Sequence, residues 1–272
     1  MAYKLIEGGG VTTPQGFLAG ACYVGVKSRK SEKPDVAIIY SEQPASCAAM
    51  FTTNKFCAAP VILDREILKK GKARAVVINS GNANAATGTQ GIEDAKRVET
   101  EAEKLLNLGE DEVFVCSTGV IGQKLPVEKV LDGVRRIVPE LSKDKGTDAA
   151  WAIMTTDTVR KEVAYEMELS GGTVRIGAMA KGSGMIHPNM ATMLAYITTD
   201  AKVDASVLQG MLKKSTDKSF NMMTVDGDTS TNDSLFLLAN GASGIRAEGE
   251  DAALLEKGLT DILGQISYML VK

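Results

Sequence analysis

Thr192 is the residue of this chain whose type and surroundings point most directly to chemistry. It follows a loop punctuated by glycine and proline, residues 182–190, and precedes an apolar run, residues 193–198, that is typical of a buried strand. A threonine hydroxyl is a poor nucleophile unless a base takes its proton, and a threonine at the start of a chain carries that base in its own α-amine. An α-amine titrates near about 7.7–8.0, which suits proton transfer at neutral pH. We therefore hypothesise that the protein cuts its own Ala191–Thr192 peptide bond and that Thr192 becomes both an N-terminus and a nucleophile.

The cleavage step needs only groups that are neighbours in the sequence. The Thr192 hydroxyl would attack the carbonyl of Ala191, the acyl group would move from nitrogen to oxygen, and water would then release it. Ala191 is small and leaves its carbonyl accessible, and the nearby glycines permit an unusual backbone geometry. A threonine at the start of a β-strand is also common without such chemistry. These residue types alone therefore leave both interpretations open.

The chain has one histidine, His187, and four cysteines, at positions 22, 47, 57 and 116. The cysteines lack Cys-x-x-Cys spacing and one histidine cannot complete a zinc site of the usual type, so we predict no metal centre. We expect the cysteines to be small, buried, apolar residues. The shortage of histidine also excludes most Ser-His-Asp and Cys-His schemes unless His187 is the base, and we favour a loop position for it. The base must then come from elsewhere.

The composition is that of an ordinary soluble protein. The 272 residues are 44% apolar and 24% charged, with a formal net charge of −3, which is typical of one large or two moderate globular domains. The charge gives no sign of a polyanionic partner such as a nucleic acid. No apolar run approaches the ~18 residues of a membrane span, and the first residues lack an apolar signal core. We therefore expect a cytoplasmic protein without a membrane partner.

Strand and helix patterns alternate along the chain, which predicts an α/β fold. Short apolar or alternating runs predict strands, a Gly-Gly turn predicts a β-hairpin, and apolar residues at helical spacing predict amphipathic helices. The expected strands are residues 20–26, 36–40, 75–78, 113–116, 163–169, 174–178, 193–198 and 235–239. The expected helices are residues 91–106, 126–138, 147–154, 204–218 and 252–271.

Three polar segments could contribute to a site. Residues 117–122 predict a turn between a strand and a helix. Such a turn aims free backbone N–H groups at one point. It could form an oxyanion hole, but it is also a common connection in α/β proteins. Residues 79–88 are small and polar, so backbone can approach a ligand or another strand there. Residues 224–233 are acidic, but a calcium loop would need a differently placed glycine and a closing glutamate. For them we favour turns in which side chains bond to the backbone.

Five stretches resemble the ornithine acetyltransferase family, the glutamate N-acetyltransferases of arginine biosynthesis. They occur in the order found in the family, and the resemblance as a whole runs from the N-terminus to nearly the last residue. The length of the stretches argues against a chance resemblance. The stretches are residues 79–84 (NSGNAN), 116–122 (CSTGVIG), 153–158 (IMTTDT), 181–194 (KGSGMIHPNMATML) and 225–233 (VDGDTSTND).

The resemblance implies a two-step acetyl transfer. Thr192 would take the acetyl group from N-acetylornithine, release ornithine, and pass the acetyl group to glutamate. Matched position by position, Thr118 and Gly119 would stabilise the oxyanion, and Thr155, Lys181 and Thr192 would contact substrate. A lysine there suits the carboxylate of an amino acid. The family needs no metal or prosthetic group, and some members also accept acetyl-CoA as the acetyl donor.

The resemblance also implies an architecture. The family fold is a layered α/β sandwich of the DmpA-like type, with an N-terminal nucleophile. It consists of an α chain, here residues 1–191, and a β chain, here residues 192–272, and such pairs assemble further, as in a heterotetramer. Family members continue beyond the position of Lys272 with a segment that also binds substrate. The resemblance therefore implies that this chain lacks the C-terminal part of the family.

Two alternatives use the same residues differently. An N-terminal-nucleophile aminopeptidase of related architecture would keep Thr192 as the nucleophile but hydrolyse peptides. An inactive, truncated ligand-binding fragment would keep the Ala191–Thr192 bond intact, and Thr192 would be inert.

Overall fold

The structure, a computed structural model, describes residues 3–27, 33–182, 193–222 and 229–272. The strands found there are β1 Tyr3–Leu5, β2 Phe17–Cys22, β3 Val36–Phe51, β4 Lys72–Asn82, β5 Val113–Val120, β6 Lys161–Leu169, β7 Gly172–Lys181, β8 Leu194–Thr199 and β9 Ser234–Ala239. The α-helices are α1 Ala59–Leu68, α2 Gly88–Leu106, α3 Val127–Ile137, α4 Gly146–Ala152, α5 Ala205–Asp217 and α6 Gly249–Val271. Three short 3-10 helices are η1 Val138–Glu140, η2 Lys143–Lys145 and η3 Phe220–Met222.

A single long strand, β3, shapes the whole sheet. The nine strands form one mixed sheet in the order β1-β6-β7-β8-β9-β3-β4-β5, and β2 pairs with β3. The first part of β3, residues 36–40, lies between β2 and β4, whereas residues 46–51 pair with β9. The register of β3 against β4 shifts between Tyr40 and Ala45, an irregularity that lets a strand bend. The sheet therefore divides into two halves that share β3. One half holds β2, β4, β5 and the first part of β3, and the other holds β1, β6, β7, β8, β9 and the last part of β3.

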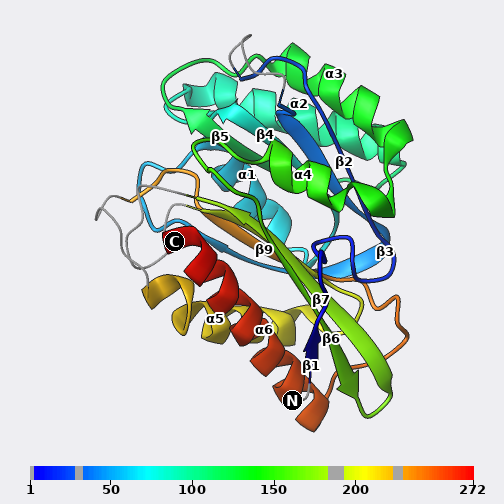
Figure 1. The fold of residues 1–272 in the computed structure, drawn as a ribbon. Helices are drawn as coiled ribbons and strands as arrows, with labels where there is room; N and C mark the ends of the chain where they lie inside the picture. The colour runs from blue at the N-terminus through cyan, green and yellow to red at the C-terminus, as the bar shows by residue number, and fades with distance from the viewer. Residues whose placement is uncertain (1–2, 28–32, 183–192, 223–228) are drawn as a thin grey trace.

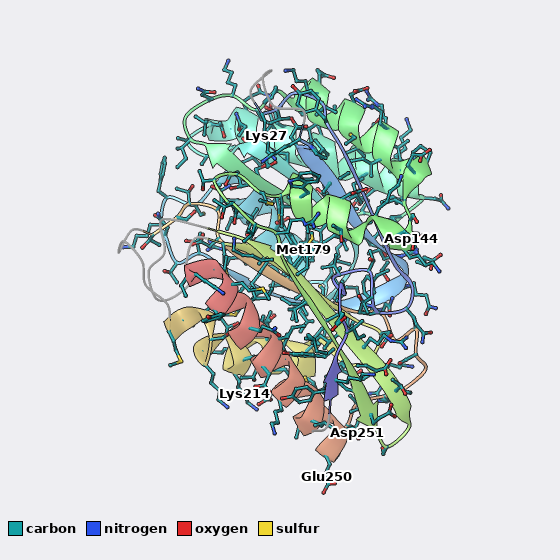
Figure 2. All side chains as sticks on the ribbon, viewed as in Figure 1. Lys27, Asp144, Met179, Lys214, Glu250 and Asp251 are labelled. Atoms are coloured by element: carbon teal, nitrogen blue, oxygen red, sulfur yellow. The ribbon has the colours of Figure 1, made fainter. Side chains whose placement is uncertain are left out.

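The two halves of the sheet face each other. Phe114 of β5 and Phe236 of β9 lie with ring centroids 4.6 Å apart, although β3 and β4 separate their strands in the sheet order. Neighbouring strands lie ~4.8 Å apart, so a flat sheet would hold these rings about 14 Å apart. Tyr196 of β8 stacks on Phe236, and Met179 of β7 belongs to the same inner core, near the centre of the view in Figure 2.

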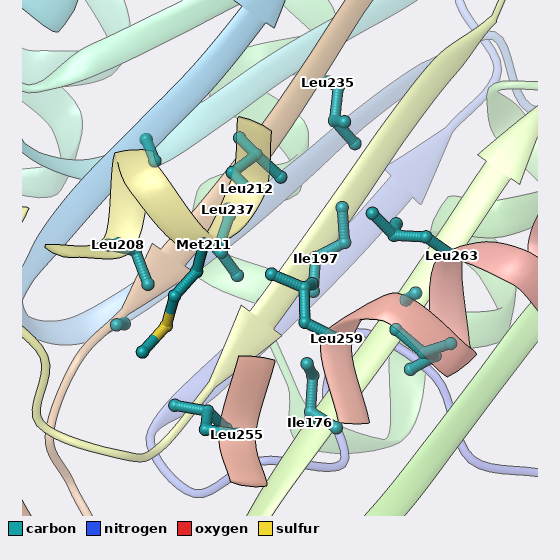
Figure 3. Close-up of a cluster of buried hydrophobic side chains, with 14 of the residues drawn as sticks. Ile176, Ile197, Leu208, Met211, Leu212, Leu235, Leu237, Leu255, Leu259 and Leu263 are labelled. Atoms are coloured by element: carbon teal, nitrogen blue, oxygen red, sulfur yellow. The ribbon is translucent and has the colours of Figure 1, made fainter. Parts of the chain in front are cut away.

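Helices cover the outer faces of both halves. Successive side chains of a strand point to opposite faces, so Ile197, next to Tyr196, packs against α5 and α6 (Figure 3). Val115, next to Phe114, packs in the same way with residues of α2 and α3. The layers run helix, sheet, sheet, helix (Figure 1). The predicted layered α/β sandwich is confirmed.

Helix α1 covers the edge strand of the sheet. Asp64 of this helix accepts a hydrogen bond from the backbone N–H of Val115 on β5 at 2.9 Å. Unpaired N–H groups on an edge strand would otherwise be open to pairing with another chain. Ile67 of α1 and Ala149 of α4 close the inner core.

The expected strands and helices are all present with altered ends, and some segments were missed. The strand expected at residues 20–26 is β2, which lies a few residues earlier, and β3 runs on to Phe51 instead of ending at residue 40. Helix α1 and the short strand β1 were not predicted. Strand β5 continues to Val120 where a turn was expected from residue 117.

Two further expectations concern exposure and the membrane. Cys47 and Cys116 are buried as predicted, whereas Cys22 and Cys57 are partly exposed, and all four thiols are free. In the described part of the chain, no helix is both long enough and apolar enough to cross a bilayer.

Candidate active site

The ends of β5 and β7 bring together two of the predicted site residues. Lys181, the last residue of β7, donates from Nζ to Oγ1 of Thr118 on β5 at 3.1 Å. The two residues stand 63 positions apart in the sequence, and both are buried, with 6% and 9% of their surface exposed. Lys181 also pairs with Leu194 at the start of β8. The contact therefore lies beside the strand that follows the predicted nucleophile.

Gly119 lets the end of β5 lie close to β4. It has a φ of +136°, and a Cβ on it would lie 2.3 Å from the carbonyl carbon of Gly81 on β4. Gly81 has a φ of +113°, and a Cβ there would lie 2.7 Å from the backbone nitrogen of Lys27. Only glycine fits two such positions, because both the space and the positive φ exclude a side chain. The segment that was expected to be a turn is therefore the irregular end of a strand.

Hydrogen bonds of asparagine and serine side chains hold the same end of β5 in place. Ser117 donates to Oδ1 of Asn79 on β4 at 2.7 Å. Asn232 donates from Nδ2 to the carbonyl oxygens of Ser117, at 2.8 Å, and of Ala83, at 2.6 Å. All of these residues are buried. Ser117, which precedes Thr118, is thus held by Asn79 and by Asn232. One of these residues comes before position 192 in the sequence and the other after it.

Buried charges surround Lys181. Burial lowers its pKa, and the carboxylates of Asp157 and Asp233 act in the opposite direction. Asp157 accepts from Nζ of Lys161 at 2.6 Å and from the backbone N–H of Gly182 at 2.8 Å. Burial would raise the pKa of Asp157, but these two hydrogen bonds and the charges of both lysines hold it below its usual range. Asp157 is therefore an anion that supports the end of β7.

Asp233 has a different environment, although it lies next to the same lysine. It is 1% exposed, and its Oδ1 accepts from the backbone N–H of Met193 at 3.2 Å. Its Oδ2 is buried and has no hydrogen-bond partner among the described residues. Burial raises the pKa of Asp233 to about 8, against the Ser230 hydroxyl, the Met193 N–H and the charge of Lys181. Asp233 therefore holds its proton more tightly than an ordinary carboxyl group does.

The structure describes some of the remaining predicted residues. The backbone N–H of Thr155 donates to Oδ2 of Asp157 at 3.2 Å, so Thr155 joins the site through this carboxylate. Ala191, Thr192 and His187 lie outside the described residues. Met193, covalently joined to position 192, is buried beside Asp233.

Three site residues escaped the sequence analysis: Asp157, Asn232 and Asp233. The acidic stretch that contains Asp233 was interpreted as turns with local side-chain hydrogen bonds. The described part bears this out, since the hydroxyl of Ser230 accepts from the backbone N–H of Asn232 at 3.1 Å. The available signal was the resemblance, because all three residues lie within the matching stretches.

Comparison with known proteins shows the family of this chain. The chain matches the ArgJ family over residues 18–272. A relative from Symbiobacterium thermophilum, an arginine biosynthesis bifunctional protein ArgJ, is 52% identical over 236 residues. The chain belongs to the ArgJ family. The alignment covers 87% of this chain and 59% of that relative, so the chain spans less than two thirds of the length of the ArgJ protein it matches.

Solved structures share the fold of this chain. The ornithine acetyltransferase of Mycobacterium tuberculosis, solved in complex with ornithine, is 40% identical with a TM-score of 0.63, over 68% of this chain and 98% of that chain. The L-aminopeptidase D-Ala-esterase/amidase of Ochrobactrum anthropi, a variant of the Ntn hydrolase fold, matches 97% of this chain and 86% of its own chain. Its TM-score is 0.59 at 11% identity, so this likeness shows the fold alone.

Proposed function

We infer that this chain is the self-processing catalytic part of an acyltransferase, in which Thr192 carries an acetyl group from N-acetylornithine to glutamate. The observation that carries the inference is the buried hydrogen bond between Lys181 and Thr118, next to the start of β8. It joins two predicted site residues beside β8, the strand that follows position 192. The name of the ArgJ relative, which places it in arginine biosynthesis, and the ornithine bound to the solved ornithine acetyltransferase support acetyl transfer that involves ornithine.

The transfer proceeds through an ester on Thr192. The Thr192 amine takes the hydroxyl proton as the oxygen attacks the acetyl carbonyl of N-acetylornithine. The carbon–nitrogen bond of the donor then breaks, and ornithine leaves as an amine that carries the proton. In the second step the amine of glutamate attacks the ester, its proton passes to the Thr192 oxygen, and N-acetylglutamate leaves. Water must be kept out, since it would discharge the ester.

The Thr118 hydroxyl is prepared to donate to the oxyanion. Its oxygen accepts the hydrogen bond of Lys181, so its own proton is directed elsewhere. No acceptor for that proton is found among the described residues. The lysine charge strengthens the hydroxyl as a donor, and a preorganised donor of this kind contributes about 3–4 kcal/mol to transition-state stabilisation. The backbone N–H of Gly119 supplies the second donor.

Lys181 also suits the substrate itself. A buried ammonium without a carboxylate at bonding distance is costly to keep charged. Ornithine and glutamate each carry an α-carboxylate, which would complete the charge balance at this position. Thr155, held by Asp157, extends the same surface toward the substrate.

Processing into two chains is supported by the length of the solved relative. The match to the Mycobacterium enzyme takes up 68% of the 272 residues, about 185, and covers 98% of that chain. That chain is thus about as long as the proposed α chain, residues 1–191. After cleavage, the proposed β chain, residues 192–272, would stay bound because β8 pairs with β7 and β9 pairs with β3. Assembly of such pairs into a larger oligomer stays a prediction.

The decisive experiment is an intact mass spectrum of the purified gene product together with an acetyl-transfer assay. Wild-type protein should contain two pieces, the shorter one starting at Thr192. Thr192→Ala should remain one chain and lose transfer from N-acetylornithine to glutamate, because both steps need the hydroxyl. Thr192→Ser, which keeps a hydroxyl, should retain both properties in part. Full transfer activity in Thr192→Ala would reject the mechanism.

The same samples separate the two alternatives. An aminopeptidase would be cut at position 192 but would release amino acids from peptides instead of forming N-acetylglutamate. A ligand-binding fragment would remain one chain and show neither activity.

A further inference from the structure

Lys27 is a second lysine near Thr118, and the mechanism above does not use it. It lies beside β4 (Figure 2), where its backbone nitrogen would be 2.7 Å from a Cβ on Gly81. Its Nζ donates to the carbonyl oxygen of Pro34 at 2.9 Å and to that of Ala152, the last residue of α4, at 3.1 Å. Two backbone acceptors therefore hold the ammonium group in one place.

Ser80 links the position of Lys27 to that of Thr118. The hydroxyl of Ser80, on β4, also donates to the carbonyl oxygen of Ala152, so it shares this acceptor with Lys27. Ser80 lies opposite Thr118 in the parallel register of β4 and β5. Paired residues of neighbouring strands present their side chains on the same face of a sheet, with the strands about 4.8 Å apart. Thr118 accepts from Lys181 there, so both ammonium groups approach one face of these two strands.

Electrostatic interactions connect Lys27 with the charges of the site. The pKa of Lys27 is lowered to about 8, chiefly by burial. The charges of Lys33 and Lys181 lower it as well, whereas Asp35 and Asp157 act in the opposite direction. Salt screens partly buried charges much less than exposed ones. Lys27 therefore belongs to the same group of interacting charges as Lys181.

The two carboxylates of this group are engaged elsewhere. Asp35 is fully buried and accepts backbone N–H groups through both of its oxygens. Asp157 accepts from Nζ of Lys161 at 2.6 Å. Within the described parts of the chain, neither carboxylate forms an ion pair with Lys27 or Lys181. An anionic substrate at this face would therefore meet two positive charges that lack a direct partner there.

We propose that Lys27 favours glutamate as the acetyl acceptor, by adding a second positive charge to the face of β4 and β5 that carries Thr118. The proposal rests on the proposed function, since it concerns the second step of the acetyl transfer. At pH 7 glutamate has a net charge of −1, because it carries two carboxylates, whereas ornithine has a net charge of +1. A fixed positive charge nearby stabilises the first and repels the second. Lys27 thus acts on specificity through its charge and needs no contact with the substrate.

The two acceptors can be compared on the same acetylated enzyme. N-acetylornithine supplies the acetyl group in both assays at pH 7, and either glutamate or isotopically labelled ornithine receives it. Ornithine must be an acceptor, because it is the product of the first step and that step is reversible. The ratio of the two kcat/KM values cancels any damage that slows both acceptors alike. A residue that only stabilised the end of α4 would therefore leave the ratio unchanged.

Lys27→Gln is the main variant, because an amide still donates hydrogen bonds to carbonyl oxygens but carries no charge. We expect the glutamate-to-ornithine ratio of kcat/KM to fall about tenfold or more. Lys27→Arg keeps the charge and should keep the ratio within threefold of wild type. Lys129→Gln is the matched control. Lys129, on α3, is exposed and donates to the carbonyl oxygen of Gly25 at 2.7 Å, in the same segment as Lys27, and its loss should not change the ratio.

The possible results separate this proposal from the one on which it rests. A ratio in Lys27→Gln within threefold of wild type would overturn it, even if both kcat/KM values fell. Failure of Lys27→Gln to fold, with Lys27→Arg folded, would make Lys27 a structural residue and would overturn it as well. A wild-type protein that transfers acetyl from N-acetylornithine to neither acceptor would instead reject the proposed function.

Discussion

The two ends of strand β7 each carry a basic residue, and the two residues differ in burial and in hydrogen-bond partners. Near the start of the strand, Arg175 bonds to Oε2 of Glu166 through Nε at 3.1 Å and through an Nη at 2.8 Å. Both side chains are about one third exposed. The backbone N–H of Arg175 bonds to Asp200 at 2.7 Å, and the second oxygen of Asp200 accepts the N–H of Gln15 at 2.9 Å. Each charged group at this end has a direct partner.

At the other end, Lys181 is buried and its described partner is the Thr118 hydroxyl. Asp157 is already occupied by Lys161 and Gly182, and Asp233 leaves one oxygen unpaired. Burial of charge without direct pairing lowers stability. A sequence tolerates such an arrangement where function requires it, which supports the proposal that this end serves the reaction while the Arg175 end stabilises the fold.

Removal of the basic group should give the largest difference between the two ends in acetyl-transfer activity and in Tm. Lys181→Met keeps most of the side-chain volume but removes the charge. We expect kcat/KM for acetyl transfer to fall about 1,000-fold, because substrate anchoring and the support of Thr118 are lost together. The Tm should not fall, since an uncompensated buried charge disappears.

Arg175→Met is the matched control for the opposite end. It should keep kcat/KM within twofold while the Tm decreases. If Lys181→Met lost as much stability as activity, Lys181 would be a structural residue and the contrast between the ends would fail.

A somewhat smaller effect is expected from Thr118→Val, which replaces the hydroxyl with a methyl group of similar size. We expect kcat to fall about 100-fold or more with KM within about threefold, because the donor acts on the transition state. Thr198→Val is the control, since Thr198 is also buried but donates to the backbone oxygen of Val11 at 2.7 Å. Steady-state kinetics of both variants decide the matter. A change confined to KM would remove Thr118 from the oxyanion role.

The sequence predicted the regular parts of the fold well, because their periodicity reflects burial on one face. It failed where residues are small. The second half of β3 contains Pro44 and a run of serine, alanine and cysteine. No strand pattern is visible in residues 41–51, so the sequence did not predict that β3 continues to Phe51. Helix α1 is short, with a weak alternation of apolar and charged residues. The end of β5 looks like a turn because Gly119 is needed for close packing against Gly81.

Only some members of the site were predicted from the sequence, and none of their contacts were. Resemblance supplied Thr118 and Lys181, yet their hydrogen bond depends on the bend in β3 that brings the two halves of the sheet together. Asp233 could not be found from residue types, since acidic residues near glycine are usually solvated. Only the fold shows that this carboxyl is buried beside Met193.

The smallest effect should come from Glu166→Gln, at the Arg175 end. This ion pair is partly exposed and lies on a surface-facing part of the hairpin, so its loss should cost less than about 1 kcal/mol of unfolding free energy. The loss should shrink further in high salt, and kcat/KM should stay within twofold of wild type. Urea denaturation at low and high salt, alongside the transfer assay, measures both quantities. A loss of activity similar to that of Lys181→Met would mean that the charges at the two ends of β7 act as one network, because only coupling along the strand could carry the effect from Glu166 to Thr118.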